Sequence, residues 1–197
     1  MTPTEFVAGL AEVMGVEKTE LATVDRALAK RGFRTLARGR SRPDITLQEG
    51  LQIAFAWAGA KHVTTAADEV ERLQRFFLVT VVQGGLFEGG EETVKADKYF
   101  REVFGADPRD LNGMGFLDVL AIAARSLGTG KVPEKSMQVI ITKGGMVGLS
   151  YQRDQKRPQL RFAEGGKFEF RQQPNVRVTF EISGAVLKWI FDVTEGA

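Results

Sequence analysis

The sequence concentrates positive charge in one short stretch near its N-terminus. Between residues 26 and 42 there is no acidic residue, and the basic residues are Arg26, Lys30, Arg31, Arg34, Arg38, Arg40 and Arg42. The whole chain carries a formal net charge of only +2, so the remainder is net acidic. Arginine dominates the stretch, and its planar guanidinium group suits phosphate oxygens and guanine edges. This asymmetry predicts a polyanionic partner for one end of the molecule.

The residues before this stretch have the spacing of two short helices joined by a tight turn. Ala11 is followed four residues later by Gly15. A small side chain at Ala11 lets a second helix approach the first, and Gly15 can adopt the left-handed conformation that ends a helix. Apolar side chains are expected to fill the wedge between the two helices: Leu10, Met14, Val16, Leu21 and Val24.

The second of these helices is expected at about residues 19–31, closed by Gly32, with a polar outer face. Helix-turn-helix modules place their second helix in the DNA major groove. Candidate DNA contacts on and beside this helix are Lys18, Thr19, Glu20, Thr23, Arg26, Lys30 and Arg31. The residues that follow, RTLARGRSR, are expected to form a basic arm along the DNA backbone or in a minor groove. This arm supplies Arg34, Arg38, Arg40 and Arg42.

A structural interpretation of the same residues stays open. Two amphipathic helices around a glycine turn occur in many helical domains that bind no nucleic acid, and a basic run is often a solvated face. The run of basic residues directly after the turn favours the DNA-binding interpretation.

Other chemistry has little support in the sequence. The chain has no cysteine and a single histidine, His62, which excludes thiolate chemistry and leaves little room for histidine metal sites or catalytic triads. The segment SLGTGK, residues 126–131, lacks the spacing of a phosphate-binding loop, and Val132 stands where Ser or Thr is needed. The carboxylates of Glu91, Glu92, Asp97 and Glu102 are more typical of an exposed helix than of a metal site. We therefore expect a protein that is not an enzyme and that uses no cofactor and no metal.

The N-terminus carries an acidic residue early and has no positive region, so a secretory signal is not expected. No apolar run approaches the ~20 residues that span a bilayer. These features predict a cytoplasmic protein that does not associate with membranes.

Helical patterns cover the first two thirds of the chain. The sequences Thr2–Glu5 and Thr46–Glu49 are capping boxes, and the second opens a helix at about residues 47–60. Further helices are expected at about 65–83, 92–104 and 115–127. The end of the first of these, RFFLVTVV, is apolar nearly all round, so we expect other helices or another subunit to bury it.

The apolar period changes to two after a Gly- and Pro-containing segment at residues 128–135. Strands are expected at 137–142, 147–152, 159–163, 167–172 and 176–183, arranged as an antiparallel meander. The tail after Ser183 fits either a helix or a sixth strand, and the helix is favoured. The predicted fold class is α+β, with an N-terminal helix-turn-helix bundle and a small antiparallel sheet. The predicted divisions are a DNA-binding region at 1–62, a helical middle region at 63–130 that could mediate oligomerisation, and a β domain at 131–197.

The segment GLAEVMGVEKTELATVDRAL resembles the helix-turn-helix of bacterial and phage DNA-binding regulators. The matching residues are Ala11, Gly15, Val16, Leu21, Val24 and Leu28, and the resemblance covers about residues 6–32. With the arm and the third helix, to about residue 60, the chain also resembles short DNA-binding proteins of phages and prophages. One departure is that many regulators have Ser or Thr two residues after the turn glycine, where this chain has Glu17. The cap of the second helix is therefore expected to be displaced or weak.

The resemblance implies a sequence-specific double-stranded DNA-binding protein that regulates transcription by occupying an operator, as a homodimer or a higher homo-oligomer. Two alternatives stay open. A DNA-packaging component of the small-terminase kind has a similar layout, with RFFLVTVV as its ring interface. A non-enzymatic inhibitor or adaptor would use the basic face to dock an acidic protein partner.

Overall fold

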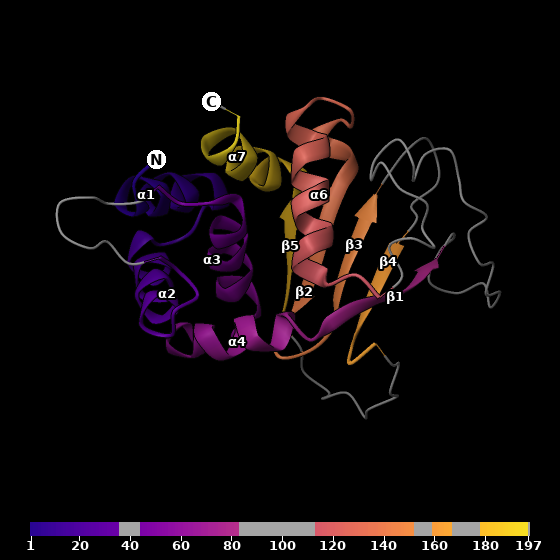
Figure 1. Ribbon diagram of the computed structural model, residues 1–197, viewed down its shortest axis with the longest axis horizontal. Coiled ribbons are helices and arrows are strands. Elements are labelled where there is room, and N and C mark those ends of the chain that lie inside the picture. The colour runs from indigo at the N-terminus through magenta and orange to yellow at the C-terminus, as the bar shows by residue number, and fades with distance from the viewer. Residues whose placement is uncertain (36–43, 83–112, 152–158, 167–177, 197) are drawn as a thin grey trace.

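The computed structural model describes residues 1–35, 44–82, 113–151, 159–166 and 178–196. Helices α1 (Pro3–Met14), α2 (Lys18–Lys30), α3 (Leu47–Gly59) and α4 (Ala66–Leu73) form a layer at one side of the molecule (Figure 1). A short 3₁₀ turn, Val63–Thr65, leads into α4. Beside this layer stand a twisted sheet and the helices α6 (Phe116–Gly128) and α7 (Gly184–Thr194).

The starts of the helices follow from local capping. Thr2 and Glu5 form the predicted capping box of α1, and Thr46 and Glu49 form that of α3. The predicted turn after α1 is confirmed, since Gly15 has a φ of +66° and ends the helix. The helix predicted at 115–127 is confirmed as α6, and the favoured helix after Ser183 is confirmed as α7.

In the part of the chain that the structure describes, five antiparallel strands form one sheet in the order β1-β4-β3-β2-β5. They are β1 (Phe76–Val82), β2 (Met137–Thr142), β3 (Val147–Tyr151), β4 (Gln159–Glu164) and β5 (Thr179–Ser183). Strands β2, β3 and β4 form the predicted meander, and β5 returns along the other side of β2. The strand expected at 167–172 and the helix expected at 92–104 lie outside the described residues.

The structure corrects the helix predicted at about 65–83. Helix α4 ends at Leu73, and RFFLVTVV contributes strand β1, which pairs with β4. The segment is rich in aromatic and β-branched residues, which favour strands, and a short run that is apolar all round fits a buried strand as well as a helix. The middle region is therefore not wholly helical, and this segment forms an edge of the sheet.

A single cluster of buried apolar side chains joins the helices to the sheet. The rings of Phe55 in α3, Phe116 in α6 and Phe162 in β4 contact one another in series, with centroid separations of 5.8 and 5.0 Å. At the other end of the cluster Phe6 of α1 packs against Trp189 of α7. All three predicted ranges of the chain contribute to this cluster, and α3 lies at its centre between α2, α4, α6, α7 and β2. The fold is of the α+β class, as predicted. Within the described ranges no helix combines the length and apolarity needed to cross a membrane.

Candidate nucleic-acid interface

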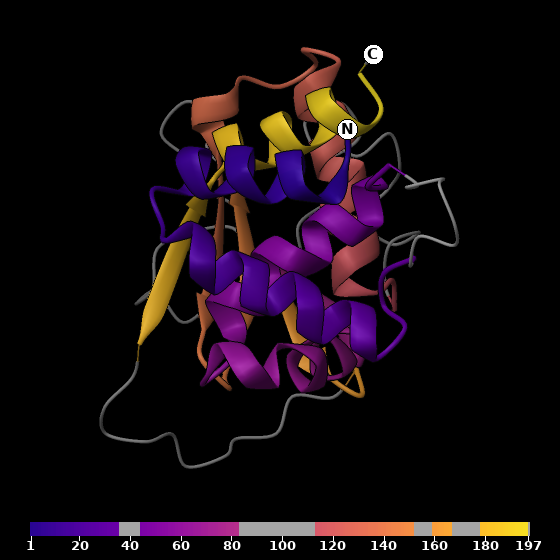
Figure 2. The same ribbon diagram turned by 90° about the vertical axis from the view of Figure 1, so that its left-hand side faces the viewer.

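Helix α2 lies on the outer side of the helical layer, with α1 crossing beside it (Figure 2). Its inner face packs against α1, α3 and α4. Leu21, Val24 and Leu28 carry this packing and are at most 1% exposed. The core therefore fixes the rotation of α2, and its opposite side faces away from the protein.

Four polar residues form a narrow row on that outward side, which we call the α2 stripe: Thr19, Thr23, Arg26 and Lys30. Their spacing of four, three and four residues places them on one line along the helix. Thr23 is half-buried, and the others are exposed. The Thr23 hydroxyl donates to the Thr19 carbonyl at 2.9 Å, and Arg26 Nη2 donates to the Thr23 hydroxyl at 3.3 Å. Within the described part of the chain neither Arg26 nor Lys30 has an ion-pair partner, so both charges are available to a ligand.

The first turn of α2 places Lys18 and Glu20 on either side of the stripe. Lys18 is exposed, whereas the Glu20 carboxylate accepts a hydrogen bond of 2.8 Å from Nε1 of Trp57 in α3. Glu17 occupies the N-cap position and makes no side-chain capping bond, which fits the weak cap predicted for this helix. Glu20 is thus partly engaged in holding α2 against α3.

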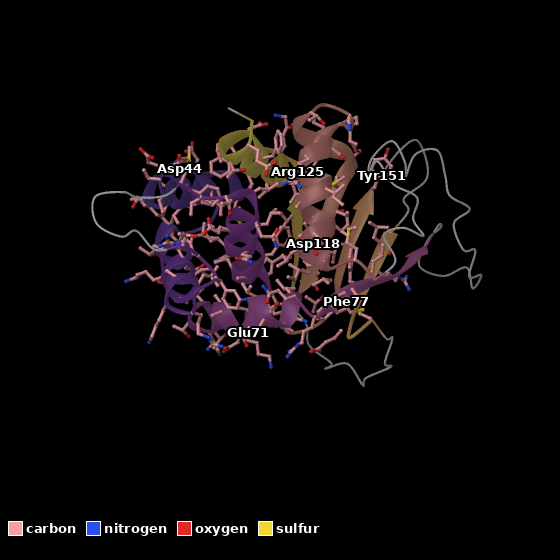
Figure 3. All side chains as sticks on the ribbon, in the orientation of Figure 1. Asp44, Glu71, Phe77, Asp118, Arg125 and Tyr151 are labelled. Atoms are coloured by element: carbon pink, nitrogen blue, oxygen red, sulfur yellow. The ribbon has the colours of Figure 1, made fainter. Side chains whose placement is uncertain are left out.

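Arg31 points away from the stripe towards α4. Its guanidinium forms ion pairs with Asp68, at 3.3 Å, and with Glu71 (Figure 3 labels Glu71). The hydrogen bond that Arg31 donates to Glu71, together with the negative charge of that carboxylate, raises the pKa of Arg31. These acidic residues neutralise a cation that the sequence pattern had grouped with the DNA contacts.

Arg34 is likewise directed towards the protein's own carboxylates. Its Nε lies 2.5 Å from Oδ1 of Asp25, and both side chains are nearly buried, at 12% and 13% exposed. Burial raises the pKa of Asp25, and the charge of Arg34 opposes that rise only in part. The charge pattern could not reveal this pair, because Asp25 stands just outside the run of basic residues. We assign Arg34 an anchoring role at the C-terminal end of α2.

Glu49 has a second contact that its capping box did not predict. Its Oε2 accepts bonds of 2.9 and 3.0 Å from the backbone N–H and the hydroxyl of Thr46, and its Oε1 accepts a bond of 2.7 Å from the N–H of Thr35. Burial alone would raise the pKa of Glu49, but these bonds together lower it. One carboxylate therefore binds the chain on both sides of residues 36–43. The predicted contacts Arg38, Arg40 and Arg42 belong to that segment and lie outside the described residues.

The other groups considered from the sequence form no site in the described regions. His62 is exposed before the 3₁₀ turn and makes no capping bond. SLGTGK forms the end of α6 and the turn after it, which is not the strand-to-helix setting of a phosphate loop. No cluster of three or more acidic or histidine side chains able to hold a metal occurs among the described residues. The carboxylates of Glu91, Glu92, Asp97 and Glu102 lie outside them.

Comparison with protein-family models, curated proteins and solved structures finds no match to this chain.

Proposed function

We propose that this protein is a sequence-specific double-stranded DNA-binding protein of the phage or prophage regulator type, with α2 as its recognition helix. The observation that carries the proposal is the α2 stripe. One side of α2 is fixed in the core by Leu21, Val24 and Leu28, and the other carries two threonines and two cations in a row. Among the described residues, neither cation has an ion-pair partner. A helix of this kind fits the width of the major groove.

The side chains of the stripe can divide base recognition and backbone contact between them. Arg26 stands at the middle of the row. Its Nε donates to the Ala22 carbonyl at 3.1 Å and its Nη2 to the Thr23 hydroxyl at 3.3 Å, so donation of two N–H groups to guanine would exchange or share these bonds. The threonines can contact bases or the thymine methyl group, and Lys18 and Lys30 lie near the ends, where phosphates flank a groove. The sequence adds Arg38, Arg40 and Arg42 as further phosphate contacts. The mechanism is occupancy of an operator, without chemistry on the DNA.

The proposal assigns Arg31 and Arg34 to positioning. Both are engaged by carboxylates, Arg31 by Asp68 and Glu71 and Arg34 by Asp25. Removing Arg34 from a nearly buried pair would leave Asp25 without its partner, which is costly. The DNA-packaging alternative has less support than the sequence suggested. RFFLVTVV, the segment expected to form its ring interface, contributes strand β1 of the sheet.

Selection of duplexes from a random DNA pool by the full-length chain tests this function. We expect enrichment of one sequence pattern, with an affinity for the selected duplex at least ~10³-fold above that for a scrambled one. Lys135→Ala serves as the control for the loss of a surface cation, and it should select the same sequence as the wild type. Lys135 is exposed and lies before β2, far from α2 along the chain. Recovery of no enriched sequence, together with no duplex binding at low salt, would remove the proposal.

A further inference from the structure

The two faces of the sheet differ in what packs on them. Val139, Leu149 and Ile182 point to one face and belong to the buried cluster, and the helices that the structure describes pack there (Figure 1). Successive side chains of a strand point to opposite faces, so the residues between these lie on the other side of the sheet, which we call the outer face. None of the described residues of β2, β3, β4 and β5 on the outer face belongs to the buried cluster.

Four residues of the outer face lie side by side in one row across the sheet, which we call the outer row. Arg161 of β4 pairs with Gly148 of β3, and Gly148 pairs in turn with Ile140 of β2. Ile140 pairs on its other side with Glu181 of β5. Neighbouring strands are about 4.8 Å apart, so Arg161 and Glu181 stand roughly 14 Å from each other at the two ends of the row. Glu181 is exposed, and the other three residues are partly exposed.

Gly148 lies inside a strand that has no internal need for a glycine. Its pairing with both neighbouring strands is regular, and it is not among the glycines with a positive φ. Among the described atoms, a Cβ built there would meet only the Leu160 carbonyl oxygen, at 3.4 Å, which is an ordinary van der Waals distance. Glycine weakens a strand interior and often marks a place where another backbone or a ligand comes close. Since neither a bulge, nor strain, nor internal crowding accounts for Gly148, a close external neighbour is the remaining reason.

The charges at the two ends of the outer row are opposite. Arg161 has no ion-pair partner among the described residues. The Glu181 carboxylate accepts a hydrogen bond of 2.6 Å from Nε2 of Gln138, which holds the carboxylate in place and uses only its Oε2. Opposite charges at equal distances from the centre of a row are self-complementary, because a twofold rotation about an axis parallel to the strands exchanges the two ends.

We propose that the outer face of the sheet is the interface for a second copy of this chain, in a twofold-symmetric dimer whose sheets pack face to face. Arg161 of each copy pairs with Glu181 of the other. Ile140 of each copy fills the space that Gly148 of the other leaves open. Sheets packed in this way lie about 10 Å apart with their strands nearly aligned, and rotation about an axis parallel to the strands keeps that alignment. This interface goes beyond the proposed function, because it forms without DNA.

Charge reversal tests the pairing in the full-length chain without DNA, with sedimentation equilibrium at low salt as the measurement. Wild type should dimerise, and Arg161→Glu or Glu181→Arg should each raise the dimer Kd at least ~10-fold, because symmetry places two pairs of like charges in the interface. An equimolar mixture of the two variants should return the Kd to within about threefold of the wild-type value, since each charge then meets its opposite. Glu12→Arg is the control, because it reverses an exposed charge on α1 and should leave the Kd unchanged.

Gly148→Val tests the packing separately from the charges. Valine favours strands, so the variant should fold, as circular dichroism can verify. Its side chain would occupy the space assigned to Ile140 of the second copy, and we expect the dimer Kd to rise about tenfold or more.

The outcomes separate this inference from the proposed function. A wild type that stays monomeric at every concentration would overturn the interface, as would a mixture in which the two charge-reversed chains do not associate. If either charge variant fails to fold, Gly148→Val decides, and a Kd equal to that of the wild type would then overturn the inference. A dimer that selects no DNA duplex removes the proposed function and leaves the interface standing, whereas a monomer that selects one does the reverse.

Discussion

At the scale of single residues, the structure divides a run of cations that is uniform in sequence. Arg26 and Lys30 face outwards from α2 without a carboxylate partner in the described regions. Arg31 and Arg34 are held by Asp68, Glu71 and Asp25. Arg26 and Lys30 lie on the side of α2 opposite its buried face, whereas Arg31 and Arg34 follow the helix and turn back towards carboxylates of α4 and α2.

This division predicts different effects of two arginine substitutions on DNA binding. Arg26→Ala should reduce the preference for the selected duplex over a scrambled one by about tenfold, because one base-reading pair is worth ~1–3 kcal/mol. Arg31→Ala should change the Kd for either duplex by less than about twofold, since that charge is already neutralised by exposed ion pairs. Competition titrations with both duplexes measure these ratios. Equal effects of the two substitutions would contradict the assignment.

A second residue-scale prediction concerns pH and Glu49. The folded-state pKa of Glu49 is lowered, so its contribution to stability is present above its unfolded pKa of ~4.3 and is lost as pH falls through the folded value. Wild type should therefore exceed Glu49→Gln in free energy of unfolding at pH 7, with the gap closing below about pH 4. Urea denaturation at several pH values checks this. Asp25, whose pKa is raised, is present in both proteins and largely cancels in this difference, so a gap that stays constant on acidification would contradict the role of the Glu49 carboxylate.

At this scale, the sequence was enough to place the polar side chains of α2 and the cap of α3, but not to say which protein groups bind them. The spacing from Thr19 to Lys30 was sufficient to place the stripe on one face, and Thr46–Glu49 was sufficient to predict a cap. The partners of Arg31, Arg34 and the second oxygen of Glu49 were not predictable. They come from α4, from a residue just outside the basic run and from the chain before α3, and only the tertiary packing brings these groups together.

At the scale of elements, α3 packs against α1, α2 and α7. Gly50 of α3 lies at this crossing, where a Cβ would come within 2.8 Å of Phe6 and 2.9 Å of Ile190. Both neighbours are fully buried.

Gly50→Ala should consequently destabilise the protein, although alanine is favoured over glycine within a helix by ~1 kcal/mol. Overpacking of a fixed core costs ~1–3 kcal/mol and should exceed that gain. Chemical denaturation gives the sign directly. A stability equal to or above that of the wild type would mean that α1, α3 and α7 are free to separate.

Most of the described helices and strands were predictable from the sequence, and β1 is the exception. Helices with caps and strands with alternating polarity were located to within a few residues, as in α3 and β2. Strand β1 was taken for a helix because RFFLVTVV follows a helical pattern and has no turn signal of glycine or proline before it. Its strand geometry is stabilised by pairing with β4, more than 70 residues later, and local pattern carries no information about that partner.

At the scale of the whole molecule, one buried cluster connects residues from all three predicted ranges. Strand β1 completes the sheet from the middle range, and α7 returns from the C-terminal range to pack on α1 and α3. A division of the chain at residue 130 would expose apolar surface on both sides.

We accordingly expect a single cooperative unfolding transition, coincident by tryptophan fluorescence and circular dichroism. Trp57 and Trp189 report on the helical layer and on α7, while far-ultraviolet circular dichroism includes the sheet. A fragment of residues 1–130 should not fold cooperatively, because it lacks the partner strand of β1. Two resolved transitions in the full chain would show that the ranges are independently stable.

The assembly state distinguishes the regulator from the packaging alternative. A C2 dimer would present two copies of α2, and regulators of this type bind half-sites about 34–36 Å apart. Light scattering on the full chain should therefore give a dimer in the presence of the selected duplex. A ring of many subunits would favour a packaging role.

The most direct test of the account is the salt dependence of DNA binding by wild type, the α2 stripe variant Arg26→Ala/Lys30→Ala and the control Lys135→Ala. Fluorescence anisotropy between about 50 and 200 mM salt should show that the stripe variant loses about one unit from the slope of log Kd against log salt, because Lys30 is its phosphate contact. It should also lose preference for the selected duplex, while the control behaves as wild type. If the stripe variant and wild type show the same slope and the same preference, α2 does not contact DNA, and the central claim is wrong.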